Sequence, residues 1–205
     1  MEFYETIANR RTVREWAKED VAEETLRRIL GAGLCAPSND HQRNWEFVVL
    51  HSREEKEQAL RFVEEWTRKQ AEAKRAVPDG TPAQRMYAYA MPRQYTMLLE
   101  APYVVVPVFK AGPNVFHAES VNQLNSFASI WCVIENIFLA ASAEGLACSL
   151  RIPVGDEGKK AAKALQVPPD YLIPCYIGIG HTAEGAPELE QNTYAADEKM
   201  HAGKW

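Results

Sequence analysis

The sequence lacks the patterns that mark several common kinds of catalytic site. It contains no GxxxxGK[ST] loop and no GxSxG motif, in which glycines bend the chain around a phosphate or a nucleophilic serine. Gly178-Ile179-Gly180 ends a strand-like segment, without the third glycine and the following helix of a dinucleotide-binding fingerprint. The P-loop, serine-hydrolase and Rossmann classes of enzyme are therefore excluded.

Cysteine is scarce, with four residues in a chain of 205, and no two of them form a CxxC pair. Each lies inside an apolar segment, where an isolated cysteine is usually a small buried hydrophobic side chain. We expect this of Cys35, Cys132, Cys148 and Cys175. His117-Ala118-Glu119 resembles half of a zinc-deaminase signature, but Pro174-Cys175 has no second cysteine three residues later, so no metal site is expected.

Positive charge and long apolar runs are also missing. The formal net charge is −5 at pH 7, whereas a general nucleic-acid-binding protein normally has a positive excess. The opening residues MEFYETIANRR contain no apolar stretch of the secretory kind, and no apolar run approaches the roughly 20 residues that cross a bilayer. We therefore expect a cytoplasmic protein without nucleic-acid or membrane partners.

Hydrophobic periodicity predicts a mixture of helices and strands. Helices are expected over residues 2–9, 21–34, 53–76, 121–144 and 156–166, with Asp20 as the cap of the second. A loop over 77–82 is followed by a mostly helical stretch up to about residue 100. Strands are expected over 46–51, 101–109, 146–152 and 172–180.

The helix over 121–144 is apolar nearly all round, so it must be covered on every side, as a central core helix or as a dimer helix. Gly145 should end it. No repeat or break in composition divides the chain, and we predict a single domain over 1–205. Its polar tail, 183–205, has no core of its own but ends in Trp205, so we expect it to lie against another surface.

The most informative segment is Arg10–Arg14, which places three guanidinium groups and a hydroxyl within five residues. Arginine forks match phosphate oxygens and keep their charge. A second segment, Ala36–Trp45, leads through proline, serine and asparagine into an apolar strand. The pair of segments suggests a bound phosphate cofactor. Taken alone, the arginine cluster is equally typical of a solvated surface.

Four motifs, in order along the chain, resemble the FMN-dependent nitroreductase family: RRTVR, APSNDHQRNWEFVV, ENIFLAASAEGLACS and PPDYLIPCYIGIG. The resemblance covers nearly the whole chain. It implies an α+β fold with a central antiparallel sheet flanked by helices, built as an intertwined homodimer. FMN would lie in two sites at the dimer interface, and the tail 183–205 would wrap the partner subunit.

The resemblance also implies which residues contact FMN. The first motif would bind the phosphate, ribityl chain and pyrimidine side, and the second would approach the flavin from the partner chain. An amide before the second strand would reach the flavin, and the segment after Gly145 would face its N5 edge. The matching positions are Arg10, Arg11, Thr12, Arg14, Pro37, Ser38, Asn39, His41, Gln94, Ser149, Leu150 and Arg151.

The sequence departs from the family pattern in two places. His41 stands where asparagine is usual, and Arg43-Asn44 where Gln-Pro is usual, although Trp45 is retained. These departures put substrate access and hydrogen bonding in question. The basic residue that usually completes the phosphate site late in the chain is missing from 188–192. Lys199 or Lys204 would have to replace it, unless the first two arginines suffice.

The activity that the resemblance implies is electron transfer from NAD(P)H through flavin N5 to an electron-poor acceptor, such as a nitroaromatic or a quinone, by a ping-pong mechanism. Arg14 would stabilise the reduced flavin. Such chemistry needs no nucleophile, metal or catalytic triad, because the cofactor carries it. Two alternatives stay open: a flavin-binding, storage or sensing protein with little turnover, and a specialised dehalogenase, dehydrogenase or flavin-breakdown enzyme of the same fold.

Overall fold

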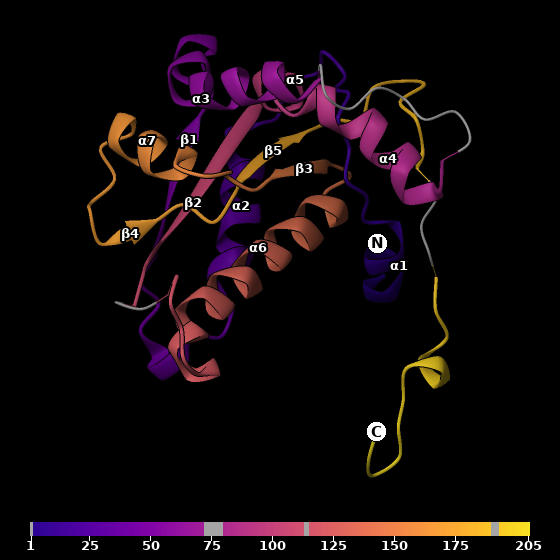
Figure 1. Ribbon diagram of the computed structural model, residues 1–205. Helices are drawn as coiled ribbons and strands as arrows, with labels where there is room; N and C mark the ends of the chain where they lie inside the picture. The colour runs from indigo at the N-terminus through magenta and orange to yellow at the C-terminus, as the bar shows by residue number, and fades with distance from the viewer. Residues whose placement is uncertain (1, 72–79, 113–114, 190–192) are drawn as a thin grey trace.

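An antiparallel sheet forms the centre of the computed structural model, which describes residues 2–71, 80–112, 115–189 and 193–205. The strand order is β1-β2-β5-β3, and β4 pairs with the far end of β2 (Figure 1). Every pairing is antiparallel. The strands are β1 (Trp45–Leu50), β2 (Tyr103–Lys110), β3 (Ala147–Arg151), β4 (Tyr171–Leu172) and β5 (Tyr176–Gly180).

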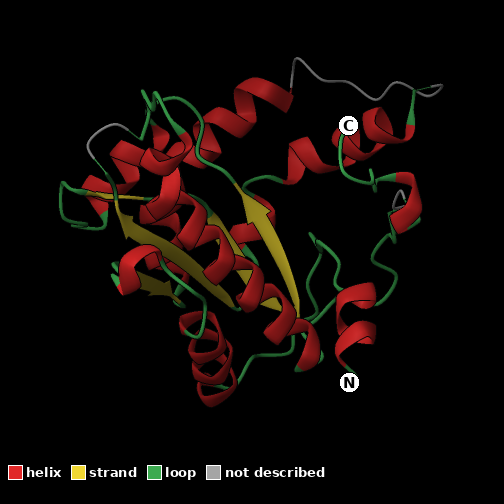
Figure 2. Cartoon of the chain, turned by 90° about the horizontal axis from the view of Figure 1, so that it is seen from below, coloured by secondary structure: helices red, strands yellow, loops and turns green. Residues whose placement is uncertain are grey.

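Helices cover both faces of this sheet (Figures 1 and 2). They are α1 (Phe3–Asn9), α2 (Glu23–Leu34), α3 (Arg53–Ala71), α4 (Pro82–Ala90), α5 (Thr96–Leu99), α6 (Asn125–Ala143) and α7 (Glu157–Ala164), with short 3₁₀ turns at η1 (Asn39–His41), η2 (Met91–Arg93), η3 (Val121–Leu124) and η4 (Ala196–Glu198). The predicted α+β fold with a central antiparallel sheet and flanking helices is confirmed.

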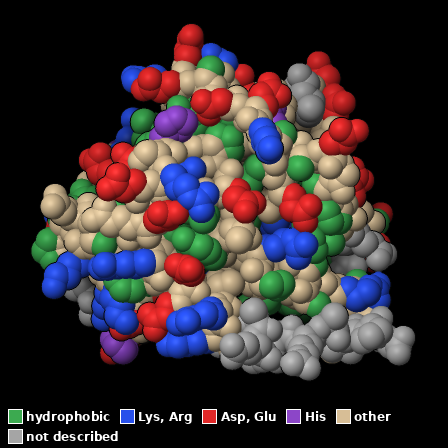
Figure 3. Space-filling view, turned by 90° about the horizontal axis from the view of Figure 1, so that it is seen from above, with side chains coloured by type: hydrophobic (Ala, Val, Ile, Leu, Met, Phe, Trp, Pro, Cys, Tyr) green, Lys and Arg blue, Asp and Glu red, His purple; other side chains and the backbone are tan. Residues whose placement is uncertain are grey.

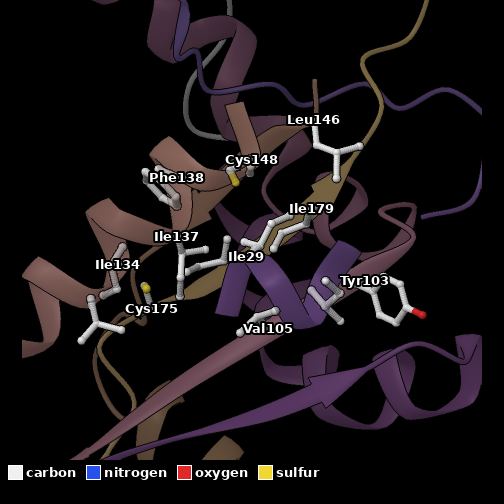
Figure 4. Close-up of a cluster of buried hydrophobic side chains, with 14 of the residues drawn as sticks. Ile29, Tyr103, Val105, Ile134, Ile137, Phe138, Leu146, Cys148, Cys175 and Ile179 are labelled. Atoms are coloured by element: carbon white, nitrogen blue, oxygen red, sulfur yellow. The ribbon is translucent and has the colours of Figure 1, made fainter. Parts of the chain in front are cut away.

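The sheet separates two hydrophobic clusters, because alternate residues of a strand point to opposite faces. Val105 and Phe109 of β2 belong to the cluster beneath α2 and α6, and Val104 and Val106 to the cluster beneath α3, α5 and α7. Figure 4 shows the first cluster, in which side chains from α2, α6 and three strands converge. The strongest strand in the sequence is thus buried on both sides.

The long apolar helix is a core helix on its inner face. Its buried side chains, such as Ile130 and Ile137, pack against the sheet and α2. Phe127, one turn before Ile130, is 38% exposed, and its ring centroid lies 6.0 Å from that of Phe109 in β2. Gly145, with φ of +76°, follows its last turn, a conformation that glycine adopts without strain.

The expectation that no apolar segment approaches the length of a membrane span was wrong for this helix. Val121–Ala143 is 23 residues long and contains an 18-residue window with a mean hydropathy of 1.5, so it is long and apolar enough to cross a membrane by length and composition. Core helices of proteins outside membranes pass the same test, and 44% of the most apolar window is buried inside this chain. The packing against α2 and the sheet accounts for the apolar surface that the helix buries.

Several local predictions also need correction. Asp20 does not cap α2, because its carboxylate accepts from the adjacent N–H of Val21 and the helix begins three residues later at Glu23, without a side-chain cap. The last predicted strand is divided into β4 and β5, with Pro174, which has no N–H to donate, between them. The mostly helical stretch expected before residue 100 is confirmed and consists of α4, η2 and α5. Residues 72–79, from the end of the long helix and the following loop, lie outside the described residues.

The cysteines are all free, but only two of them are buried. Cys148 and Cys175 lie in the core, whereas Cys35 and Cys132 are exposed, so the prediction was wrong for those two. Cys35 directly follows α2, and Cys132 lies within α6. Apolar neighbours in the sequence did not reveal on which side of a helix a cysteine lies.

The C-terminal tail runs away from the body of the chain (Figure 1). Its described residues 193–205 are exposed, and Trp205 is fully so. On the face shown in Figure 3, basic and acidic side chains are interspersed. The contact of the tail with another surface, and the single domain over 1–205, remain predictions.

Candidate functional site

A cavity of about 550 Å³ opens beside the N-terminal arginines, a size typical of small-molecule and cofactor sites. Residues 9–14 form one wall, and the end of α6 with the start of β3 forms another. Met86 and Tyr89 of α4 and the segment Thr182–Leu189 contribute the rest of the lining. Arg10, Arg11, Thr12 and Arg14, the predicted contacts of the first motif, all line this cavity.

The first motif is held in place from both sides. The N–H of Val13 donates to the carbonyl of Cys148 in β3 at 2.9 Å, and the N–H of Ala17 donates to the carbonyl of His181 at 2.9 Å. Trp16 anchors the same stretch, since its indole N–H donates to the carbonyl of Met97 at 2.7 Å. The arginines therefore project from a backbone that is fixed by the sheet, and not from a free loop.

Arg14 is the residue whose environment most clearly calls for a ligand. Its Nε is buried and has no hydrogen-bond partner among the described residues. Burial lowers the pKa of its guanidinium, and the charge of Arg93 acts in the same direction, while Tyr89 opposes them. A desolvated cation without a counter-charge is costly, and an anion in the cavity would offset that cost.

The other two arginines have only weak partners. Arg10 Nε lies 3.7 Å from Glu135 Oε1, in a pair whose side chains are 28% and 55% exposed, and such pairs contribute little. Arg11 donates to backbone carbonyls, those of Ala8 and Arg10. Both guanidinium groups therefore keep donors available for an oxyanion in the cavity.

A hydrogen-bonded cluster ties α4 to the first motif. Glu15 Oε1 accepts from the hydroxyl of Tyr89 at 2.9 Å and from Nε of Arg93 at 3.1 Å. The guanidinium of Arg93 also stacks on the ring of Tyr89, 4.1 Å from its centroid. Glu15 thus neutralises Arg93 and leaves the neighbouring Arg14 uncompensated. No sequence pattern predicts this cluster, because Glu15 is more than 70 positions from both Tyr89 and Arg93.

The second motif lies elsewhere in the chain. Asn39 Oδ1 accepts from Asn125 Nδ2 at the start of α6, whereas the arginine-lined cavity borders the end of α6. The predicted contacts Pro37, Ser38, Asn39 and His41 therefore do not meet the arginines within one chain. Asp40, His41 and Arg43 have positive φ angles of 51°, 52° and 47°, a conformation that is uncommon outside glycine.

The predicted residues of β3 also lie away from the cavity lining. The segment that borders the cavity is Gly145–Cys148, just before Ser149, Leu150 and Arg151. Ser149 is fully buried, and Leu150 is half-buried. Arg151, 3% exposed, forms a buried ion pair with Glu157.

Gln94 is engaged with the same buried pair. Its Oε1 accepts from Arg151 Nη1 at 3.3 Å, and its Nε2 donates to the carbonyl of Ala90 at 3.1 Å. The ring of Trp66 lies 4.7 Å from the Arg151 guanidinium. Burial raises the pKa of the Glu157 carboxyl despite the adjacent arginine. In this structure Gln94 therefore belongs to a buried polar cluster between β3, α3 and α7.

Among the described residues after β5, those that line the cavity include one acid, Glu188, and no lysine. The lining residues of the cavity end with Glu188 and Leu189. Lys199 lies over the ring of Tyr194, with Nζ 4.4 Å from the centroid, within the exposed tail. Neither Lys199 nor Lys204 lines the cavity of its own chain. Among the described residues, Arg10, Arg11 and Arg14 are its cations.

Comparison with known proteins now identifies the family. The model of the nitroreductase family matches residues 7–181. The chain belongs to the nitroreductase family. It is 38% identical, over all of its length and 88% of the relative, to the "Putative NADH dehydrogenase/NAD(P)H nitroreductase" of Methanothermobacter thermautotrophicus. It is 30% identical, over 89% of its length and 83% of the relative, to the 5,6-dimethylbenzimidazole synthase of Rhodospirillum rubrum.

The fold of this family member is also that of iodotyrosine deiodinase. A solved structure of the oxidised deiodinase, bound to FMN and 3-iodo-L-tyrosine, matches over the full length of both chains with a TM-score of 0.77 and 18% identity. The family thus includes nitroreductases, deiodinases and other flavin enzymes, and membership supports an oxidoreductase of the flavoprotein type. The buried, unpartnered Nε of Arg14 and the two weakly paired arginines beside it suit the phosphate and the N1–C2=O edge of FMN.

Proposed function

We propose that this nitroreductase-family chain is a cytoplasmic FMN-dependent oxidoreductase, which takes electrons from NAD(P)H and delivers them to an electron-poor organic acceptor such as a nitroaromatic or a quinone. The observation that supports it best is the cavity lined by Arg10, Arg11 and Arg14, in which the Nε of Arg14 is buried and has no hydrogen-bond partner among the described residues. FMN, when bound, supplies the two-electron redox chemistry. The protein supplies binding, orientation and charge.

In this proposal the three arginines contact different parts of FMN. Arg10 and Arg11, with the hydroxyl of Thr12, hold the FMN phosphate through charge-assisted hydrogen bonds. Arg14 lies deeper and faces the ring system, where its permanent charge favours the anionic reduced form. The cluster of Glu15, Tyr89 and Arg93 keeps that charge available, because Glu15 compensates Arg93 alone.

The proposal requires a second subunit. The second motif lies beside the start of α6 and does not reach the cavity at the end of α6 in its own chain. In a homodimer, its residues Pro37, Ser38, Asn39 and His41 approach the FMN of the partner subunit. Gln94 reaches the flavin only if its side chain leaves Arg151. Gly145–Cys148 line the cavity and face the N5 edge of the flavin. Ser149 and Leu150 follow them directly and lie just behind this edge.

Anaerobic mixing with NADH or NADPH tests the proposal. The oxidised flavin band near roughly 450 nm should be lost with at least one of the two, since the flavin carries the redox chemistry. Because donor and acceptor would use one site in turn, initial-rate lines should be parallel when both are varied. Lack of reduction by either nicotinamide would favour a storage or sensing protein, and converging lines would contradict a shared site.

A second candidate function is reductive dehalogenation. The chain is 31% identical to the iodotyrosine deiodinase of Hydra vulgaris over 93% of its length. Dithionite-reduced protein mixed with 3-iodo-L-tyrosine distinguishes the two candidates. Rapid reoxidation of the flavin with release of iodide would favour the dehalogenase, and reoxidation by nitroaromatics alone would favour the nitroreductase.

A further inference from the structure

The turn that leads from η1 into β1 has an unusual backbone. Asp40, His41 and Arg43 have φ angles of 51°, 52° and 47°. In the described part of the chain, Gln166 is the only other non-glycine residue with a positive φ. Such residues cost roughly 1–3 kcal/mol each, and they occur most often at functional sites. The backbone strain of this chain is therefore concentrated in one turn, which belongs to the second motif.

Specific hydrogen bonds hold this turn in place. The N–H of Arg43 donates to Oγ of Ser38 at 3.1 Å, and its carbonyl accepts from the N–H of Trp45 at 2.9 Å. The N–H of Asn39 donates to Oγ of Ser129 in α6 at 3.1 Å. Because both backbone groups of Arg43 are used, the base of its side chain has a fixed position beside α6.

The guanidinium group of Arg43 is exposed, and it has no ion pair or hydrogen bond among the described residues. The acid of the same turn, Asp40, accepts from Nδ2 of Asn39 at 2.9 Å. The backbone does not require arginine at this position, since glycine or asparagine adopts a positive φ at lower cost. What Arg43 contributes is therefore its free guanidinium group.

The proposed homodimer brings this turn to the FMN of the partner subunit. An acceptor must lie over the same flavin to receive electrons, so the turn borders the place where the acceptor binds. Arg43 stands at a position where glutamine is usual in the family pattern. This chain thus adds a permanent positive charge at the border of the acceptor site.

We propose that the acceptor is an aromatic carboxylate, whose carboxylate group pairs with Arg43 from across the dimer. This inference rests on the proposed function, because it concerns the acceptor of the same FMN site. A guanidinium group donates two parallel N–H bonds to a carboxylate, which fixes both the position and the orientation of the ligand. Since the charges of Asp40 and Arg43 offset each other at long range, the preference comes from this direct pairing.

Two ligands of nearly equal shape test the preference, 4-nitrobenzoate and its uncharged analogue 4-nitrobenzamide. Their binding to the oxidised, FMN-loaded protein can be followed through the flavin absorbance without any electron donor. The dissociation constant of 4-nitrobenzoate should be at least about tenfold lower than that of 4-nitrobenzamide. In turnover with NADH or NADPH, the ratio of kcat/KM for the two acceptors should favour 4-nitrobenzoate to a similar extent.

Substitutions at Arg43 assign the preference to its guanidinium group. Arg43→Gln removes the charge and should bring the two dissociation constants to within about threefold of each other. Arg43→Lys keeps the charge but loses the two-pronged geometry, so its ratio should lie between those of Arg43→Gln and the wild type. The matched control is Arg27→Gln, which changes an exposed arginine of α2 and should keep the wild-type ratio.

Heterodimers that bind a single FMN test whether the pairing crosses the dimer. One chain carries Arg10→Ala/Arg14→Ala and binds no FMN, so the other chain holds the flavin. Adding Arg43→Gln to the FMN-free chain should abolish the preference for 4-nitrobenzoate. Adding it to the FMN-binding chain should leave the preference unchanged, because the partner still supplies the guanidinium group.

Equal binding of the two ligands by the wild type would overturn the proposal, as would an unchanged ratio in Arg43→Gln. The opposite pattern in the two heterodimers would show that Arg43 acts within its own chain and would overturn the pairing across the dimer. Turnover of both acceptors without a preference would leave the proposed function in place and remove this inference alone. A binding preference without reduction by either nicotinamide would remove the proposed electron donor and leave the carboxylate assignment.

Discussion

At the scale of single residues, Arg14 shows how the fold creates a need for an anion. The backbone around it is fixed by β3 and by the segment after β5, so its guanidinium cannot move freely to solvent. Glu15, the adjacent carboxylate, is occupied by Tyr89 and Arg93. The remaining way to compensate Arg14 is a ligand in the cavity.

The first prediction follows from that need. Arg10→Ala/Arg14→Ala should release FMN, because two charge-assisted contacts of about 1.5–3 kcal/mol each are lost, which corresponds to at least about a hundredfold in Kd. Fluorescence of released flavin measures the loss. The matched control is Arg27→Ala/Arg53→Ala, which removes two exposed arginines paired with glutamates on their own helices. Wild-type FMN affinity in the first variant would show that the phosphate lies elsewhere.

A second residue-scale prediction concerns Gly178 in β5. A Cβ at this position would lie 2.5 Å from Ser149 Oγ and 3.1 Å from both the Ala101 Cβ and the Met97 carbonyl oxygen. Gly178→Ala should therefore lower the free energy of unfolding by about 1–3 kcal/mol through overpacking, measured by urea denaturation. Adding Ser149→Ala should recover much of that loss, because the closest contact is removed.

The control for Gly178 is on α2. Gly31 has no atom within 4 Å of a built Cβ, so Gly31→Ala should stabilise the protein by up to about 1 kcal/mol through helix propensity. If Gly178→Ala is as stable as the wild type, or if the Ser149→Ala addition recovers nothing, the close approach of β5 and β3 is not what requires glycine there.

At the scale of elements, the buried pair of Arg151 and Glu157 connects β3 to α7. Both side chains are almost fully buried, and Gln94 and Trp66 complete their surroundings. Removing one partner of a buried pair leaves an uncompensated charge, whereas exposed pairs contribute little. The pair should therefore matter more for stability than the surface ion pairs of this chain.

This gives the third prediction. Glu157→Ala should lower the free energy of unfolding by about 3–5 kcal/mol, and Arg151→Met/Glu157→Ala should lower it by clearly less, because no unpaired charge remains. Chemical denaturation of both variants provides the comparison. Glu65→Ala, which breaks the exposed pair with Lys69, should change stability by no more than about 1 kcal/mol. A double variant less stable than Glu157→Ala would contradict this account of the pair.

The predictable part of the fold is what local pattern determines. The 3.6-residue periodicity of α2, the apolar run of α6 and the β-branched run of β2 appear in the structure within a few residues of the predicted limits. The missing cap at Asp20 reflects a hydrogen bond to the adjacent residue Val21, and the divided strands β4 and β5 flank Pro174, which has no N–H to donate; hydrophobic periodicity records neither feature.

The sequence predicted those residues of the candidate site that are neighbours in the chain, and missed those that are distant. The arginines were found because they are adjacent in the sequence, and all of them line one cavity. Glu15, Tyr89 and Arg93 were missed, because residues far apart in the chain meet only after folding. Arg151 was expected at the flavin edge because it lies in the segment after Gly145, but it pairs with Glu157, which belongs to the next helix along the chain.

At the scale of the whole molecule, one chain leaves several apolar surfaces uncovered. Phe3 and Tyr4 of α1 are 63% and 83% exposed, Phe127 of α6 is 38% exposed, and Trp205 at the end of the tail is fully exposed. The rings of Phe3 and Tyr4 lie 5.5 Å apart and form an exposed apolar patch, and such patches typically mark an interaction site. The segments expected to approach FMN from the partner, Pro37–His41, also have no role in the cavity of their own chain. Both observations favour an obligate homodimer.

The fourth prediction is that the protein sediments as a dimer with one FMN per chain, through an interface larger than about 2,000 Å², the range of permanent assemblies.

Deleting residues 193–205 removes the exposed tail without touching Thr182–Leu189, which lines the cavity. If the tail wraps the partner, the deletion should weaken dimerisation and leave the cavity intact, so dilution should yield monomers at higher concentration than for the full chain. Sedimentation velocity over a dilution series measures this. A stable, flavin-loaded monomer of the full chain would contradict the homodimer, and unchanged dimer stability after the deletion would contradict the role of the tail alone.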